Sequence, residues 1–186
     1  AELNHPHWLI KQLQTNWPDH YRHILTANDL PPPMALRVNV RQNSREDYLQ
    51  MLNLQGISAQ PVAQCPTALI LDEALNVDQL PGFSEGRVSV QDVAAQLAAG
   101  LLDAQPGDRV LDICAAPGGK TAAILERQPG LQSLLALDID ANRLQRVSDN
   151  LQRLHLRAET LAADAADPQS WAAGRQFERI LLDAPC

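Results

Sequence analysis

A glycine-rich turn between two apolar segments is the part of this sequence most suited to chemistry. Residues 110–113 are apolar apart from Asp112, and residues 121–127 have the composition of a helix. Small residues, Ala115-Ala116-Pro117-Gly118-Gly119, lie between them and are followed by Lys120. A strand, a tight turn and a helix in this order form the first unit of an open parallel sheet, where ligands bind beyond the carboxyl ends of the strands. The turn is therefore predicted to hold a ligand.

A phosphate-binding loop is the first alternative, because Gly119-Lys120-Thr121 matches the end of that motif. The motif also needs a glycine at the position of Cys114, since backbone N–H groups must wrap the phosphates. Pro117 removes one of these donors. The dinucleotide pattern Gly-x-Gly-x-x-Gly is absent as well. A turn with few donors favours a ligand without a pyrophosphate, such as S-adenosylmethionine.

The next apolar segment, residues 133–137, ends in Asp138. An acid about 20 residues beyond the glycine turn holds ribose hydroxyls in folds of this kind. Asp140 lies close by, but it is explained as the N-cap of a helix over residues 141–154. Asp138 is therefore predicted as the ribose ligand.

Acids also follow the two remaining apolar segments. Residues 160–163 lead to Asp164, and residues 177–182 lead to Asp183. Each acid alone is explained as a helix cap or a loop charge. Because parallel strands end at one edge of their sheet, the acids and the glycine turn together predict a single site.

The elements before residue 110 predict a smaller domain and a helical segment. Two short helices separated at Trp17-Pro18-Asp19 precede the stiff connector Pro31-Pro32-Pro33. Residues 36–40 alternate with the period of a strand, with polar residues on one face. Ser44 has the pattern of a capped helix start. Further strands are predicted at 61–63 and 68–71, with a short helical turn at 77–80 and a helix at 90–101.

These elements predict an α/β fold, in which a Rossmann-like core with its first four strands follows a small α+β (RRM-like) accessory domain. The predicted divisions are a helical segment and linker at 1–33, the accessory domain at 34–82, and the truncated N-terminal part of the core at 83–186. The chain of 186 residues, 45% of them hydrophobic, has the length for such a division.

Composition bears on several classes of protein. A net charge of −7 gives no overall basic surface for nucleic acid, although local basic patches can lie within a negative total. The three cysteines fit neither a disulfide framework nor a zinc ribbon and are typical of a reducing cytosol. No apolar run approaches the roughly 18 residues of a membrane helix, and no signal pattern opens the chain. We expect a soluble, cytoplasmic protein without a membrane partner.

Two clusters of side chains allow a structural and a functional interpretation. Four histidines suggest a metal, but none forms a helical pair accompanied by a carboxylate, so no metal is predicted; they are His5, His7, His20 and His23. Arginines near the predicted strand at 36–40 suit phosphate contacts or a solvated edge equally well; they are Arg37, Arg41 and Arg45. Three further arginines are predicted on the exposed face of the helix at 141–154: Arg143, Arg146 and Arg153.

The motifs at the glycine turn and at the end of the chain resemble one family. Residues Asp112 to Thr121, together with Asp183-Ala184-Pro185-Cys186, are similar to the RNA 5-methylcytosine methyltransferases of the Nol1/Nop2/Sun type. Arg37-Val38-Asn39 and the segment from Gly86 to Asp92 resemble the same family, so the resemblance covers nearly the whole chain. It implies that the core is that of an S-adenosylmethionine-dependent methyltransferase.

The resemblance also implies a role for each predicted site residue. The methionine end of S-adenosylmethionine would be lined by the turn residues Ala115, Ala116, Pro117, Gly118, Gly119, Lys120 and Thr121. Asp138 would hold the ribose, Asp164 would lie on the adenine side, and Asp183 would lie between cofactor and base. Cys186 belongs to the Pro-Cys motif of the family, which assists release of the methylated product.

The implied reaction is methyl transfer to C5 of a cytosine in small-subunit (16S) ribosomal RNA, by a protein expected to be a monomer. A cysteine thiolate adds to C6 and makes C5 nucleophilic enough to take the methyl group. In this family that cysteine lies in a Thr-Cys motif beyond the Pro-Cys motif. Because the sequence stops at Cys186, we expect a fragment that is inactive alone.

Two alternatives stay open on the residues alone. One is a non-catalytic module that binds cofactor or RNA, and the other is a methyltransferase for another substrate in which Cys186 is structural. Of the other cysteines, Cys114 lies inside the turn and is predicted to be a packing residue. Cys65 has no visible partner in the sequence.

Overall fold

The computed structural model describes residues 4–184 and separates into two compact units, Ala1–Pro33 and Met34–Cys186. The first unit holds the helices α1 (His7–Asn16) and α2 (Tyr21–Asn28). The predicted break at Trp17-Pro18-Asp19 is confirmed, because α1 ends at Asn16. Within the described residues, no three His, Cys, Asp or Glu side chains are grouped as they would be around a metal ion.

The second unit begins with a four-stranded antiparallel sheet in the order β2-β3-β1-β4. Its elements are β1 (Ala35–Val38), α3 (Arg45–Leu54), β2 (Ala59–Pro61), β3 (Ala68–Leu71), the 3₁₀ turn η1 (Val77–Gln79) and β4 (Val88–Val90). This is the strand order of a ferredoxin-like β-α-β-β-α-β unit whose second helix is reduced to η1. The predicted small α+β fold is confirmed. Its fourth strand lies beyond residue 82, the predicted end of this domain, because β4 pairs with β1.

Local sequence explains the helix of this accessory domain. The Ser44 hydroxyl accepts a hydrogen bond from the Asp47 N–H at 3.0 Å, and the Asp47 carboxylate accepts one from the Ser44 N–H. This reciprocal capping box confirms the predicted helix start. From α3, Tyr48 and Leu52 are fully buried against the sheet, where they contact the core around Leu36.

Of the two interpretations left open for Arg37, a phosphate contact and a solvated edge, the solvated edge is wrong. All four residues of β1 are buried, and Arg37 is 2% exposed. The reason is tertiary, since the polar face of β1 is covered by helices of the following sheet, where Glu126 pairs with Arg37. Arg41 is exposed, and Arg45 donates to the Val62 carbonyl at 3.2 Å within the accessory domain.

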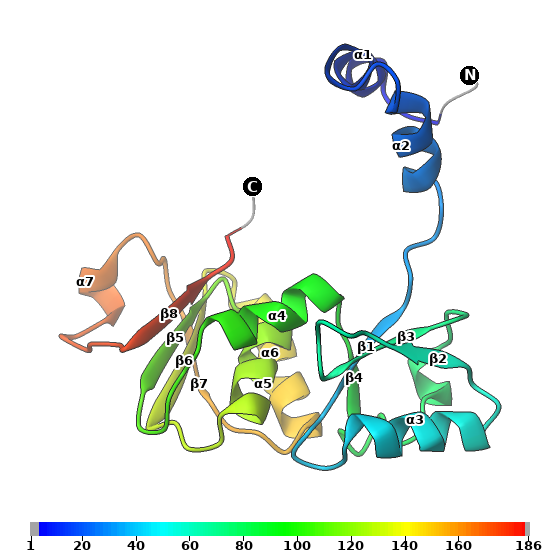
Figure 1. Cartoon of the computed structure of the whole chain (residues 1–186). Coiled ribbons are helices and arrows are strands. Elements are labelled where there is room, and N and C mark those ends of the chain that lie inside the picture. The colour runs from blue at the N-terminus through cyan, green and yellow to red at the C-terminus, as the bar shows by residue number, and fades with distance from the viewer. Residues whose placement is uncertain (1–3, 185–186) are drawn as a thin grey trace. The chain divides into compact units, whose positions relative to one another are not determined.

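The remainder of the chain forms a parallel sheet in the order β7-β6-β5-β8 (Figure 1). Its elements are α4 (Val93–Leu101), β5 (Arg109–Ile113), α5 (Gly119–Arg127), β6 (Ser133–Asp138), α6 (Ala141–Arg153), β7 (Glu159–Ala162), α7 (Pro168–Trp171) and β8 (Arg179–Leu182). Counted along the chain, the strands take the order 3-2-1-4 of a doubly wound fold. The prediction of the first four strands of a Rossmann-like core is confirmed.

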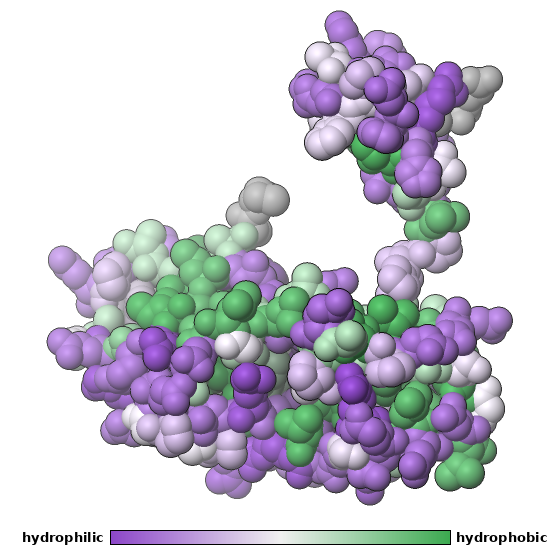
Figure 2. Space-filling view, viewed as in Figure 1, coloured by the Kyte–Doolittle hydropathy of each residue, from purple (hydrophilic) through white to green (hydrophobic). Residues whose placement is uncertain are grey.

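Apolar side chains cover both faces of this parallel sheet. Helices α4, α5 and α6 bury residues such as Ala99, Ile124 and Val147 on one face. Trp171 of α7 and Phe177 pack on the other. Large apolar side chains are also exposed over α4 and β8, where Figure 2 shows a green surface; they include Leu101, Ile180 and Leu182. No helix within residues 4–184 has the length and hydropathy of a membrane span.

Arg153, predicted to be exposed, is half-buried between the two sheets. Its guanidinium lies 4.1 Å from the ring centre of Phe83 and donates to the Phe83 and Val88 carbonyls at 2.7 and 3.0 Å. Gly86 makes this packing possible, because a Cβ atom there would lie 2.5 Å from the Arg153 carbonyl oxygen. The entry into the core domain therefore packs against the end of α6.

Asp112 is a buried acid in the central strand of the parallel sheet, 1% exposed. Its carboxylate accepts a hydrogen bond from the Thr121 hydroxyl at 2.6 Å, which ties β5 to α5. Burial raises the pKa of Asp112 from 3.8 to about 6, although Thr121 and Lys120 act in the opposite direction. The ionised carboxylate is therefore a source of instability at neutral pH.

We expect Asp112→Asn to change how stability depends on pH. The pKa of Asp112 is higher in the folded state than in the unfolded state. The Asp112 side chain therefore does not lower the free energy of unfolding below pH 3.8, lowers it increasingly up to about pH 6, and lowers it by a constant amount at higher pH. A rise of about two pKa units corresponds to roughly 3 kcal/mol. Urea denaturation at several pH values should show the variant gaining stability relative to the wild type between pH 4 and 7. A difference that is the same at every pH would contradict this.

Candidate functional site

A cavity of about 470 Å³ opens where β5 and β8 end. The turn between β5 and α5 forms one wall of it. Other residues that line it include Asp183 beyond β8, Arg143 of α6 and Gln91 just after β4. The predicted turn and one predicted acid are thus brought together with two residues from other elements.

Backbone geometry explains the glycine pair of the turn. Gly118 has a φ of +95°, and a Cβ atom there would lie 3.0 Å from the Val147 Cα of α6. A side chain is therefore excluded both by conformation and by the approach of α6. At Gly119, a Cβ atom would lie 3.3 Å from the Gln91 amide nitrogen. Gly118 itself does not line the cavity, so its role in the structure is to allow this packing.

Lys120 and Asp183 form an ion pair at the mouth of the cavity. Strands β5 and β8 are parallel neighbours, which brings the residues beyond their carboxyl ends together. The Lys120 ammonium donates to the Asp183 carboxylate, whose side chain is 58% exposed. The ion pair therefore connects the turn to the end of β8. Such a contact is expected, because both residues follow the carboxyl ends of neighbouring parallel strands.

Asp138 lies directly behind the turn and is 2% exposed. Its two oxygens accept hydrogen bonds from the Ala116 and Asp140 N–H groups, each at 3.1 Å. Each carboxylate oxygen has two lone pairs, so the group retains capacity for hydroxyl donors. Asp138 itself is not part of the cavity wall. The assignment of Asp140 as the N-cap of α6 is confirmed, because its side chain accepts from the Asn142 and Arg143 N–H groups.

Arg143 covers the same region from α6. Its guanidinium donates to the Ala116 carbonyl at 3.2 Å and lies 3.7 Å from the Asp138 carboxylate. Its side chain is about half exposed, as predicted, but it also lines the cavity. A cation therefore stands beside the buried carboxylate that was predicted to hold ribose.

Besides Gly118 and Asp138, two further predicted residues do not line the cavity. Thr121 is fully buried and its hydroxyl is used by Asp112. Asp164 is exposed beyond β7, and its carboxylate accepts from the Ala166 N–H at 2.9 Å. Cys186 lies outside the described residues.

Cys114 lines the cavity, yet its environment opposes a thiolate. Burial raises the pKa of its thiol, and the carboxylates of Asp138, Asp112 and Asp183 raise it further against the opposing effect of Arg143. A protonated thiol is a poor nucleophile. The raised pKa disfavours Cys114 as a nucleophile, and its packing role stays a prediction.

Sequence reasoning missed Gln91 and the cavity-lining role of Arg143. Neither residue belongs to a pattern that indicates a site, since Gln91 precedes a helix and Arg143 lies in the first turn of one. The only signal for Arg143 was its place five residues after Asp138. Gln91 reaches the cavity because β4 joins the accessory sheet beside the glycine turn.

Comparison with known proteins identifies both parts of the chain. A family model described as the ferredoxin-like domain of RsmF/B-like methyltransferases matches residues 5–78. A second, described as 16S rRNA methyltransferase RsmB/F, matches residues 99–186. Together these two models match most of the sequence.

Curated relatives and solved structures agree with these models. The chain is 53% identical over 182 residues to the ribosomal RNA small subunit methyltransferase B of Pseudomonas putida, covering 98% of this chain and 42% of that protein. It is 52% identical over 186 residues to the protein of the same name from Vibrio cholerae, covering 100% and 43%. A solved methyltransferase homologue from Pyrococcus horikoshii superposes with a TM-score of 0.85 at 28% identity, covering 100% of this chain and 61% of that one.

This chain thus spans less than half the length of the curated relatives it matches. Within that span, the turn, the acids at the strand ends and the accessory sheet all lie in segments shared with these relatives. The chain belongs to the RsmB/F family of RNA methyltransferases, as its resemblance to the Nol1/Nop2/Sun enzymes predicted.

Proposed function

We propose that this chain is the cofactor-binding part of an enzyme that transfers a methyl group from S-adenosylmethionine to C5 of a cytosine in small-subunit ribosomal RNA. The observation that carries the proposal is the glycine turn of residues 115–121, which forms a cavity beside Asp183. The family of the chain and the printed names of its relatives favour ribosomal RNA as the substrate. Such a substrate favours a cytoplasmic location.

The cavity suits this methyl donor better than a nucleotide. A sulfonium cation is favoured by the carboxylates of Asp112 and Asp183, whereas a phosphate would be repelled by them. Asp138 retains lone pairs for ribose hydroxyls behind the turn. When bound, S-adenosylmethionine supplies the activated methyl group. The residues present therefore fit the cofactor.

We assign the predicted roles to this chain, but we separate the turn residues that line the cavity from those that hold the turn in place. Ala115, Ala116, Pro117, Gly119 and Lys120 face the cavity and would contact the methionine end. Gly118 and Thr121 would hold the turn in place through α6 and β5. Asp183 would lie between cofactor and base, and Asp164 would approach the adenine from the loop beyond β7.

The proposed covalent chemistry involves cysteines whose positions the described residues do not include. A thiolate would add to C6 of the cytosine, and C5 would then form its bond to the methyl carbon as the sulfur leaves with the electron pair of the broken bond. Loss of the C5 proton to a base and departure of the thiolate would restore the aromatic ring. Cys186 is proposed to assist this last step.

The division of the chain that we propose has the helical segment at 1–33, the accessory domain from residue 34 through β4, and the core domain after it. Strand β8 pairs with β5 on one side, and within residues 4–184 no strand pairs with its other side. We propose that further strands of the complete enzyme pair there. The exposed side chains of Ile180 and Leu182 would then become buried.

We expect Asp138→Asn to weaken the binding of S-adenosylmethionine by the full-length protein about 10- to 100-fold. Hydrogen bonds to a charged group are worth about 1.5–3 kcal/mol, and the amide offers one acceptor where the carboxylate has two. Calorimetric titration measures the effect. Asp140→Asn is the matched control, since asparagine also caps helices, and it should bind like the wild type. Equal affinity of the Asp138 variant and the wild type would remove the ribose assignment.

We expect Cys186→Ala in the full-length protein to leave an RNA–protein adduct that survives denaturing electrophoresis. Methyl transfer would proceed, but release of the thiolate would be slowed, so the covalent species would accumulate. Cys65→Ala, a change in the accessory domain, should leave no such species. If the Cys186 variant turns over like the wild type with no adduct, the proposed role of Cys186 is wrong.

A further inference from the structure

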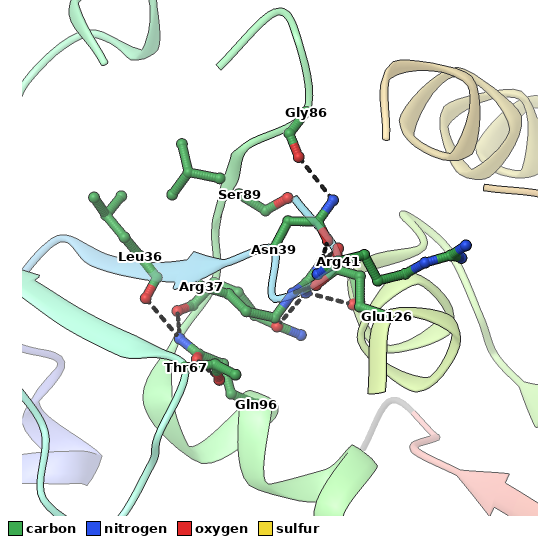
Figure 3. A network of polar contacts seen from close by, with 12 residues as sticks. Leu36, Arg37, Asn39, Arg41, Thr67, Gly86, Ser89, Gln96 and Glu126 are labelled. Carbon is green, nitrogen blue, oxygen red and sulfur yellow. Dashed lines mark hydrogen bonds and ion pairs between the residues drawn. The ribbon is translucent and has the colours of Figure 1, made fainter. Parts of the chain in front are cut away.

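Arg37 of the accessory domain reaches the glycine turn of the core. Its Nε and Nη2 atoms donate to the two carboxylate oxygens of Glu126 at 2.8 and 2.9 Å (Figure 3). Its Nη1 donates to the Gly119 carbonyl at 2.7 Å and also to the side-chain oxygen of Gln91. One buried guanidinium therefore connects β1 with both ends of α5 and with the wall of the cavity.

This contact determines which way the Gln91 amide faces. A guanidinium has donors only, so the Gln91 atom that meets it must be the amide oxygen. The amide nitrogen then faces away from Arg37. This nitrogen lies 3.3 Å from the position that a Cβ atom on Gly119 would take. Gln91 and Gly119 both line the 470 Å³ cavity. No acceptor within the described residues takes a hydrogen bond from this nitrogen.

The backbone of Gln91 is held as firmly as its side chain. Its N–H donates to the Ala35 carbonyl of β1 at 3.0 Å. Its carbonyl accepts from the buried amide of Gln96 at 2.9 Å, and the same amide donates to the Leu36 carbonyl at 3.2 Å. Figure 3 shows Gln96 bonded to Leu36 beside Arg37. The unused donor is therefore preorganised.

We propose that Gln91 donates a hydrogen bond to the carboxylate of the methionyl group of the bound methyl donor, and that Arg37 is the positioning residue that aims it. The inference rests on the proposed function, which assigns this turn to the methionine end. A carboxylate there would accept from the Gln91 amide beside the N-terminal end of α5, which also favours an anion. The accessory domain is then part of the cofactor site.

A test must separate positioning from stability. Removing Arg37 alone leaves the buried Glu126 carboxylate without its partner, which is strongly destabilising. The double variant Arg37→Gln, Glu126→Gln removes both charges and keeps polar side chains at both positions. It also removes the bond that holds the Gln91 oxygen. Gln91→Met removes the donor with little change in volume and leaves the ion pair in place.

The experiment measures the dissociation constants of S-adenosylmethionine and of its decarboxylated analogue for the full-length protein and its variants. The wild type should prefer S-adenosylmethionine. Gln91→Met should reduce that preference about tenfold, because only the ligand with a carboxylate loses a bond. The double variant should reduce it by a similar factor.

Arg153→Gln is the control, because Arg153 also bridges the two sheets but donates its hydrogen bonds to Phe83, Val88 and Ser89 rather than to the turn or to Gln91. It should lower the melting temperature without changing the preference. An unchanged preference in Gln91→Met overturns the proposal. If Gln91→Met reduces the preference for S-adenosylmethionine but the double variant keeps it in full, the role of Arg37 is overturned. A wild type that binds neither ligand instead contradicts the proposed function.

Discussion

The buried ion pair between Arg37 and Glu126 holds together two sheets that share no strand. Both side chains are almost inaccessible to water, and the two parallel hydrogen bonds fix their relative orientation. Because the cost of burying these charges is offset only in this geometry, β1 and α5 have one favourable arrangement. Arg153 makes the reverse connection, from α6 to the segment that leads into β4. The two domains of this unit therefore meet in a defined way.

That arrangement decides what forms the cavity. The glycine turn alone would offer one wall beyond β5. Packing of β4 beside it adds Gln91, and parallel pairing of β5 with β8 adds Asp183. The accessory domain is consequently more than an attachment to the core. Its sheet supplies part of the wall against which the ligand would lie.

Electrostatics in the cavity follow from the same packing. Asp112 is buried, which raises its pKa to about 6, and Cys114 lies among carboxylates that raise the pKa of its thiol. Lys120 is held by Asp183 across the mouth. The site thus combines acidic side chains with the paired Lys120 ammonium and the Arg143 guanidinium, and burial together with the carboxylates raises the pKa of the Cys114 thiol. These properties suit the binding of a cationic methyl donor.

The sequence alone determined the elements, the parallel sheet, the glycine turn and the family, because these depend on local patterns: Gly118 at a left-handed turn, Ser44 at a helix start and Asp138 after a strand. Only the tertiary structure decided which polar residues are buried. Arg37 has the alternation of a solvated strand face, and Gln91 lies in a segment whose resemblance to the family assigned it no role. Their roles depend on which surface covers them, and partners 54 to 89 residues away along the chain cannot be identified from local spacing.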